Sequence, residues 1–148
     1  MNFGAGKYTY TVQEGWGRLP EGWKFGWIPA VAVDSRDRIY VYSRSEHPMV
    51  IFDRDGNFLT SWGEDVLKDA HGIFIDRDDI VYVAELDQRV SILTLEGKRL
   101  TEWGRGVKSE TPGEFRACPH GIWTDSHGDL YVGEVQTDGR IQKFIRQR

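Results

Sequence analysis

The amino-acid sequence predicts an all-β protein, and three observations support this fold class. Apolar and polar residues alternate with a period of two along short segments, and no stretch keeps the period of an α-helix. Aromatic residues make up 13% of the chain and 17 of its 148 residues are glycine, which is typical of short strands joined by tight turns. In addition, one pattern of strands recurs three times along the chain.

The recurring pattern is aligned on Asp34, Asp76 and Asp125, each of which follows an apolar strand. A second strand comes after each aspartate, at residues 38–41, 80–83 and 129–132. A third strand follows it, at residues 49–52, 90–93 and 141–144. In the first two repeats a fourth strand ends in Trp-Gly, at Trp62-Gly63 and Trp103-Gly104. A four-stranded repeat of about 40 to 50 residues is the unit of a β-propeller blade.

We therefore expect a single domain, residues 1–148, with three blades at about residues 29–63, 70–104 and 119–146. The third repeat stops after its third strand. Residues 8–17 match the pattern of a fourth strand and close with Trp16-Gly17. This N-terminal strand is thus expected to complete the third blade.

Three blades make a half-propeller, because closed propellers have typically four to eight blades. We expect a homodimer in which two half-propellers related by a two-fold axis form a six-bladed β-propeller. Strand exchange closes this ring, since the N-terminal strand of each chain completes the third blade of its partner and shields the exposed edges. Two alternatives stay open: a monomer with a six-stranded-sheet arrangement, and a fragment that needs another protein.

Composition limits the classes of partner. The chain has 19 Lys and Arg against 23 Asp and Glu, a net charge of −4, which argues against nucleic acid as the main partner. No apolar stretch approaches the roughly 20 residues that span a bilayer. The N-terminus lacks the apolar core of a signal peptide, so the default location is cytoplasmic. The single cysteine, Cys118, excludes an internal disulfide and a cysteine-based zinc site in one chain.

The segment 119–134, PHGIWTDSHGDLYVGE, and its continuation at 140–144 resemble the NHL-repeat family of six-bladed propellers. Residues 103–115 are similar to the connector that precedes each such repeat. Within that family the His-Gly-Ile-Trp form is most similar to the propellers of peptidyl-α-hydroxyglycine α-amidating lyases. This resemblance implies a zinc-dependent enzyme in which histidines from several blades meet a metal near the channel axis.

His71 and His120 occupy the same place in repeats two and three, at the entry to the innermost strand, which lines the channel of a propeller. A two-fold axis would bring together four imidazoles, two from each chain, and imidazole is the commonest protein ligand for zinc. The equivalent residue of the first repeat is Pro29, which cannot bind a metal. The alternative is that each histidine caps its strand and bonds the backbone of the next blade. His47 and His127 lie in a loop and a turn and are weaker candidates.

Acidic and basic residues repeat as well. Glu85 and Glu134 end the second strands, where the first repeat has Ser43, and Arg89 and Arg140 open the third strands of the same blades. Pairing of each glutamate with the arginine of its own blade would hold a loop by charge-assisted hydrogen bonds. Alternatively, the four side chains line a polar mouth that receives a ligand. The three repeated aspartates are expected to bond the backbone of their hairpin turns.

Two main functions are consistent with these patterns. The first is a self-assembling binding or scaffold module, with a small molecule, ion or peptide at one face of the ring. The second, implied by the resemblance, is a metal-dependent lyase that breaks the C–N bond of a hydroxyglycine amide. Its tyrosine base and its substrate-binding arginine cannot be placed by any motif; Tyr42, Arg44 and Arg116 are only side chains of the right type.

The aromatic connector with Trp23, Phe25 and Trp27 is either a ligand platform or a packing surface between chains. A third, minor reading is a building block whose only role is assembly.

Overall fold

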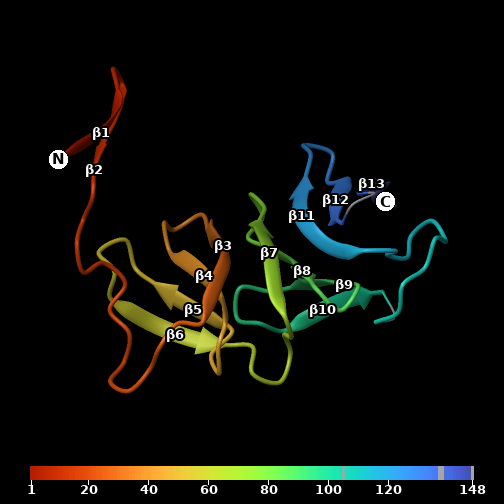
Figure 1. Ribbon diagram of the computed structural model, residues 1–148, viewed down its shortest axis with the longest axis horizontal. Helices are drawn as coiled ribbons and strands as arrows, with labels where there is room; N and C mark the ends of the chain where they lie inside the picture. The colour runs from red at the N-terminus through yellow and green to blue at the C-terminus, as the bar shows by residue number, and fades with distance from the viewer. Residues whose placement is uncertain (105, 137–138, 148) are drawn as a thin grey trace.

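The chain folds into a row of β-sheets and a separate N-terminal hairpin (Figure 1). The computed structural model describes residues 1–104, 106–136 and 139–147. Within these residues the regular secondary structure consists of β-strands, with no helix. The hairpin consists of β1 (Asn2–Ala5) and β2 (Tyr8–Thr11). The all-β prediction is confirmed. No helical segment within the described residues has the length and hydrophobicity that crossing a membrane requires.

Each of the three larger sheets is antiparallel, with its strands in chain order. Blade 1 contains β3 (Trp27–Val33), β4 (Ile39–Arg44), β5 (Met49–Phe52) and β6 (Phe58–Trp62). Blade 2 contains β7 (Ala70–Ile75), β8 (Val81–Glu85), β9 (Arg89–Leu93) and β10 (Arg99–Trp103). Blade 3 contains β11 (Cys118–Thr124), β12 (Leu130–Val135) and β13 (Arg140–Phe144). The first strand of each blade contacts the first strand of the next blade: β3 contacts β7, and β7 contacts β11. The inner strands of adjacent propeller blades are arranged in this way.

The repeated aspartates close the hairpin between the first and second strands of each blade. Asp76 Oδ1 accepts hydrogen bonds from the backbone N–H groups of Asp78 and Ile80, at 2.9 and 3.0 Å, and its Oδ2 accepts one from the Tyr82 hydroxyl at 3.0 Å. Asp125 makes the same set of bonds in blade 3, and Asp34 bonds the corresponding N–H groups in blade 1. The turn role predicted from the sequence is confirmed.

The hydrophobic core lies between the blades. Tyr40 and Tyr42 of β4 are buried against blade 2, while Val41 between them is buried on the opposite face of blade 1. That opposite face is covered by Trp16 and Phe25 of the connector that precedes β3. A second core joins blades 2 and 3, and its buried members are Tyr82, Ala84, Val90, Phe115, Ile122, Leu130 and Val132. Because both faces of a blade are apolar, each blade depends on a neighbour or a connector for cover.

Tryptophans that precede a connector form hydrogen bonds to a turn of the blade that follows. Trp62, at the end of β6, donates from Nε1 to the carbonyl oxygen of Leu95, in the β9–β10 turn of blade 2, at 3.0 Å. Gly97 ends that turn with φ of +84° and lies against the indole, so that a Cβ there would be 2.6 Å from the Trp62 ring. Trp16 donates in the same way to Arg54 in the β5–β6 turn of blade 1, at 3.0 Å.

The N-terminal strand differs in extent from the prediction. Only Tyr8–Thr11 of the predicted strand 8–17 forms a strand, and it pairs with Asn2–Ala5 in a hairpin that was not predicted from the sequence. Blade 3 has three strands, and among the described residues nothing pairs with the outer edge of β13. The hairpin projects from one end of the row and β13 lies at the other (Figure 1). The exchange of the N-terminal strand between chains stays a prediction.

Replacement of Gly97 by alanine is expected to destabilise the protein more than replacement of Gly22. Both glycines have positive φ, +84° and +82°, so an alanine at either site costs about 1 kcal/mol or more of backbone strain. At Gly22 the space around a Cβ is open, whereas at Gly97 the Cβ overlaps the Trp62 ring. We expect Gly97→Ala to lose about 2 kcal/mol more than Gly22→Ala in the free energy of urea unfolding. Equal losses would contradict the contact between the turn and the indole.

Candidate functional site

The structure brings together the two histidines that the sequence singled out. His71 lies near the start of β7 and His120 near the start of β11, and their ring centroids are 3.7 Å apart with an interplanar angle of 74°. Gly72 permits this approach, because a Cβ at that position would lie 2.0 Å from the carbonyl oxygen of His120. The two imidazoles therefore meet at one end of the inner strands of blades 2 and 3.

Arg44, the last residue of β4, reaches across from blade 1 to this pair. Its Nε donates to the carbonyl oxygen of Ala70 at 2.9 Å, and its Nη2 lies 2.8 Å from His71 Nδ1. A guanidinium has no acceptor, so His71 Nδ1 must accept this hydrogen bond and the ring proton resides on Nε2. On its other side the guanidinium lies over Trp27, 5.5 Å from the ring centroid, and the Trp27 side chain is 77% exposed.

His71 is held as a neutral hydrogen-bond donor. Burial lowers the pKa of His71 from its ordinary value, and the charges of His120 and Arg44 lower it further. The Nε2 atom is buried, and no hydrogen-bond partner for it is found in the described part of the chain. A buried N–H group without an acceptor costs about 1–3 kcal/mol, so an oxygen atom placed there would recover that energy.

The charge of Arg44 has no carboxylate partner within 4.0 Å among the described residues. Its side chain lines two hollows. One, of about 440 Å³, lies beside the aromatic connector and is also lined by Trp23 and His47; the other, of about 230 Å³, is also lined by Asp69 and Leu67. Trp27, Arg44, His71 and His120 are called the histidine–arginine cluster below. In this cluster the Arg44 guanidinium is a fixed cation next to the neutral His71 ring and the exposed Trp27 ring.

The same cluster is a poor zinc site within one chain. Among the described residues there is no group of three histidine, cysteine or acidic side chains that could hold a metal ion. Zinc sites use three or four such ligands, and His71 has no free nitrogen lone pair to offer in this arrangement, because Nδ1 accepts from Arg44 and Nε2 carries the ring proton. The zinc predicted from the sequence draws on histidines of two chains, and it stays a prediction.

The first pair of predicted ligand-binding residues, Glu85 and Arg89, forms an ion pair inside blade 2. Arg89 donates from Nε and Nη2 to the two oxygens of Glu85, at 2.8 and 2.6 Å. The fully buried carboxylate also accepts from Ser91 Oγ at 2.9 Å and from the backbone N–H of Lys68, in the connector between blades 1 and 2, at 2.8 Å. The pair therefore ties the connector to the blade.

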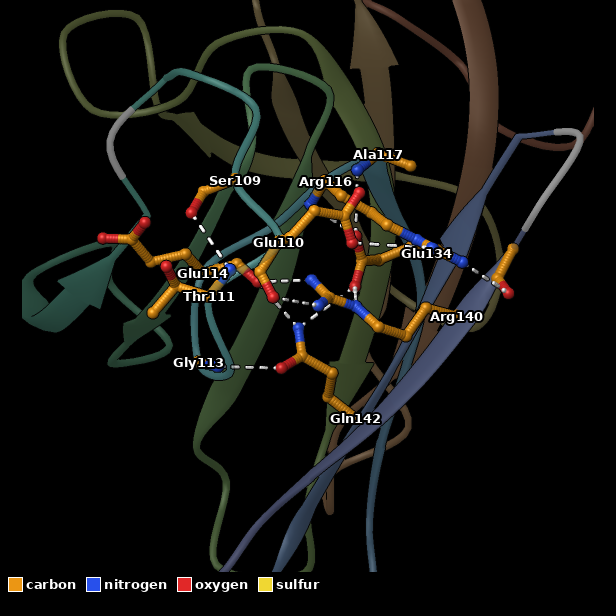
Figure 2. A network of polar contacts seen from close by, with 11 residues as sticks. Ser109, Glu110, Thr111, Gly113, Glu114, Arg116, Ala117, Glu134, Arg140 and Gln142 are labelled. Atoms are coloured by element: carbon orange, nitrogen blue, oxygen red, sulfur yellow. Dashed lines mark hydrogen bonds and ion pairs between the residues drawn. The ribbon is translucent and has the colours of Figure 1, made fainter.

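Glu134 and Arg140 form the equivalent network in blade 3, drawn in Figure 2. Glu134 accepts from Arg140 Nε at 2.6 Å and from Gln142 Nε2 at 3.0 Å. Its other oxygen accepts from the backbone N–H groups of Arg116 and Ala117 in the preceding connector, at 2.8 and 2.9 Å. In blade 1, where the sequence has Ser43, the hydroxyl oxygen accepts from the N–H of Gly26 at 3.1 Å. Binding of a ligand by these four charged residues stays a prediction.

The remaining sequence candidates lie elsewhere. His127 is 77% exposed in the turn of blade 3, and His47 stacks on Trp23 with ring centroids 3.3 Å apart. Tyr42 is fully buried and burial raises the pKa of its hydroxyl, while Cys118 contacts Gln88. What sequence reasoning missed is the contact of Arg44 with His71. The sequence does contain one indication of this contact: Arg44 is charged, whereas the equivalent residues of the other repeats, Leu86 and Val135, are apolar.

Comparison with solved structures gives the fold. The chain is similar to virginiamycin B lyase from Staphylococcus aureus, at 19% identity and a TM-score of 0.53, over 80% of this chain and 41% of the lyase. It is equally similar, at 19% identity and a TM-score of 0.53, to the catalytically inactive His-to-Ala variant of that lyase with Quinupristin, over 79% of this chain and 40% of the variant. A streptogramin B lyase structure matches at 13% identity and a TM-score of 0.53, over 84% and 41% of the two chains.

The fold is β-propeller-like. The chain spans about two fifths of the length of these lyases, and at such identities the likeness concerns the fold alone. No protein-family model and no curated protein matches the chain. The resemblance to NHL repeats therefore rests on the sequence at residues 103–115, 119–134 and 140–144, and the resemblance to amidating lyases rests on the motif around His120.

Replacement of Arg44 by glutamine is expected to raise the pKa of His71. The substitution removes the positive charge that lies 2.8 Å from Nδ1, and charge repulsion from Arg44 is one of the causes of the lowered pKa. The measurement is an NMR titration of the His71 ring protons in both proteins, with the resonances of the exposed His127 as an internal reference. An unchanged or lowered pKa of His71 would show that Arg44 does not contact the imidazole in solution.

Replacement of Glu134 by glutamine is expected to cost about 3 kcal/mol in the free energy of unfolding near pH 7, because it breaks a buried ion pair. Burial alone raises the pKa of Glu134, but hydrogen bonds from Arg140 and Ala117 and the charge of Arg140 outweigh burial and lower it. A lowered pKa stabilises the fold above the pKa of the unfolded chain, and this stabilisation disappears as the pH falls through the folded pKa.

The stability difference between wild type and Glu134→Gln should therefore shrink in acid. Urea unfolding at neutral pH and in acid measures it, and Glu21→Gln, a change at an exposed residue, provides the control. A difference that is small near pH 7, or that is independent of pH, is incompatible with an ionised Glu134 that fastens the connector to blade 3.

Proposed function

We propose that the chain is a propeller half that binds a ligand carrying an acidic or carbonyl oxygen at the histidine–arginine cluster, and that a second copy completes its ring. One observation carries the ligand part of this proposal. The Arg44 guanidinium is fixed by Ala70 and His71, has no carboxylate partner among the described residues, and lies beside a buried N–H of His71 that lacks an acceptor.

The chemistry of the cluster selects the ligand class. An arginine and a neutral imidazole N–H both donate hydrogen bonds, so they match a carboxylate, a phosphate or a polarised carbonyl oxygen. The exposed face of Trp27 offers a flat apolar surface next to that charge. A small planar carboxylate meets both conditions and provides a simple probe.

The assembly part of the proposal follows from the number of blades. The described residues form three blades, two complete and one with an unpaired edge, while closed propellers have typically four to eight. Two copies related by a two-fold axis supply six blades and give each terminal blade a neighbour. The connector that precedes β3 covers the outer face of blade 1, just as the connector that precedes β11 lies in the core between blades 2 and 3. The connector before β3 thus has the position of one that lies between two blades, and this supports a further blade next to blade 1.

A lyase reaction is the second candidate, favoured by the contact between the neutral His71 and the exposed His120. In this candidate the Nε2–H of His71 would donate to the carbonyl oxygen of a bound substrate, and His120 would be the general base, because Nδ1 of His71 already accepts from Arg44. The three structures reported above as similar in fold are lyases, and one of them is a catalytically inactive His-to-Ala variant. A zinc-dependent form of this candidate would take imidazoles from both copies, and loss of bound zinc in His120→Ala would support it.

Benzoate is expected to bind at the cluster, with saturable shifts of the His71 and His120 ring resonances. Arg44→Leu should weaken this binding by at least about tenfold, because a hydrogen bond to a charged group is worth about 1.5–3 kcal/mol. Arg36→Leu removes an exposed arginine from the turn at the opposite end of β3 and should leave the affinity unchanged. If benzoate and inorganic phosphate both fail to shift these resonances, or if both variants bind alike, the ligand proposal is wrong.

A further inference from the structure

The outer edge of β13 is an unfilled position in an otherwise repeated pattern. In blades 1 and 2 the third strands, β5 and β9, pair with the fourth strands β6 and β10. β13 is the equivalent third strand, and no described residue pairs with its outer edge. Ile141 of this strand is 74% exposed, and Ile145, just beyond it, is 66% exposed. An unpaired strand edge with exposed apolar side chains is a template for another strand.

Trp103 provides an independent sign that a strand belongs there. Trp16 and Trp62 each donate from Nε1 to a carbonyl oxygen in the turn that leads into a fourth strand. Trp103 is their equivalent at the end of the fourth strand of blade 2, yet its buried Nε1 has no partner among the described residues. Beside it lies a mostly apolar groove of about 270 Å³, also lined by Phe144 and Ile145. The turn that would cover this indole follows β13.

The segment that fits the open edge is found at the other end of the chain. Trp62 ends the fourth strand β6, and its indole binds the blade that follows. The Trp16 indole binds blade 1 in the same manner, through Arg54, with its ring 5.5 Å from that of Phe52. Residues 12–16 therefore lie where a fourth strand of a preceding blade would end. Among the described residues they have no strand partner, and Val12 is 68% exposed.

We infer that residues 12–16 of one copy form an antiparallel strand against β13 of a second copy, with Trp16 opposite Ile141, Glu14 opposite Lys143 and Val12 opposite Phe144. The inference rests on the ring of the proposed function. The register is copied from the complete blades, where Met49 pairs with Trp62, Ile51 with Thr60 and Phe52 with Phe58. Blade 2 repeats it, including the register shift of one residue, in the pairs Val90 with Trp103, Ile92 with Thr101 and Leu93 with Arg99.

The side chains that meet in this register are complementary. Glu14 and Lys143 have opposite charges, and opposite charges directly across a pair of strands are favourable. Lys143 also lies 2.8 Å from Asp129, so the ammonium group would be shared between two carboxylates. Val12 would cover Phe144, at the groove beside Trp103. Pairing within one chain is excluded by the architecture, because blade 2 separates residues 12–16 from β13 (Figure 1).

Cysteine pairs test the register. In a Cys118→Ser background, Glu14→Cys with Lys143→Cys should give a disulfide-linked dimer under mild oxidation, because residues directly opposite in a sheet have the separation that a disulfide needs. The matched control is Gln13→Cys with Lys143→Cys, since a shift of one residue turns the side chain to the other face of the sheet. Mass spectrometry under denaturing, non-reducing conditions identifies covalent dimers of the 17.0 kDa chain.

The outcomes separate this inference from the proposed function. A dimer by native mass spectrometry that cross-links in the control pair, or in neither pair, overturns the register and leaves the ring in place. A monomer at all concentrations overturns both the register and the ring, and the open edge then accepts another segment or another protein; benzoate binding still tests the ligand site. If the cysteine variants do not fold, charge exchange replaces them. Glu14→Lys should then weaken dimerisation several-fold and Lys143→Glu should restore it, and failure of the restoration counts against the register.

Discussion

Burial of both faces of the central strands of blades 1 and 2 is the constraint on which the rest of this structure depends. Alternate residues of β4 point to opposite faces, and Tyr40, Val41 and Tyr42 are all buried, so this part of the sheet has no solvent face. Such a sheet is unstable alone and must be packed on each side. The packing of successive blades then brings the inner strands next to one another, and it is this packing that places His120 of one blade against His71 of the previous blade.

The buried glutamates show how polar groups are accommodated between apolar sheets. Glu85 and Glu134 accept hydrogen bonds both from an arginine of their own blade and from backbone N–H groups of a connector, so that no carboxylate oxygen is left without a donor. Blade 1 replaces the glutamate by Ser43, and the neighbouring Arg44 turns toward His71 instead. The histidine–arginine cluster thus arises where blade 1 lacks the glutamate that the other two repeats share.

The sequence was sufficient for features with a local or repeated cause. The turn aspartates, the succession of short strands and the equivalence of His71 and His120 follow from spacing, because each repeat obeys the same geometry. The Arg44–His71 contact joins side chains of different blades and depends on how those blades are packed, which no local pattern encodes. The β1–β2 hairpin also escaped prediction. Tyr8–Thr11 has the alternation of a strand, and alternation identifies a strand without identifying its partner.

In the proposed ring, assembly and ligand binding would be physically connected. Arg44, His71 and Trp27 lie on blades 1 and 2 of one chain, whereas His120 is exposed on blade 3, the blade against which a second copy would pack. Closure of the ring would remove water from this side of the cluster, and hydrogen bonds from a guanidinium strengthen when water is excluded. Two identical halves would also carry two such clusters across a two-fold axis. A ligand with a single carboxylate would then occupy each cluster independently, while one with two acidic ends could span the axis and stabilise the dimer.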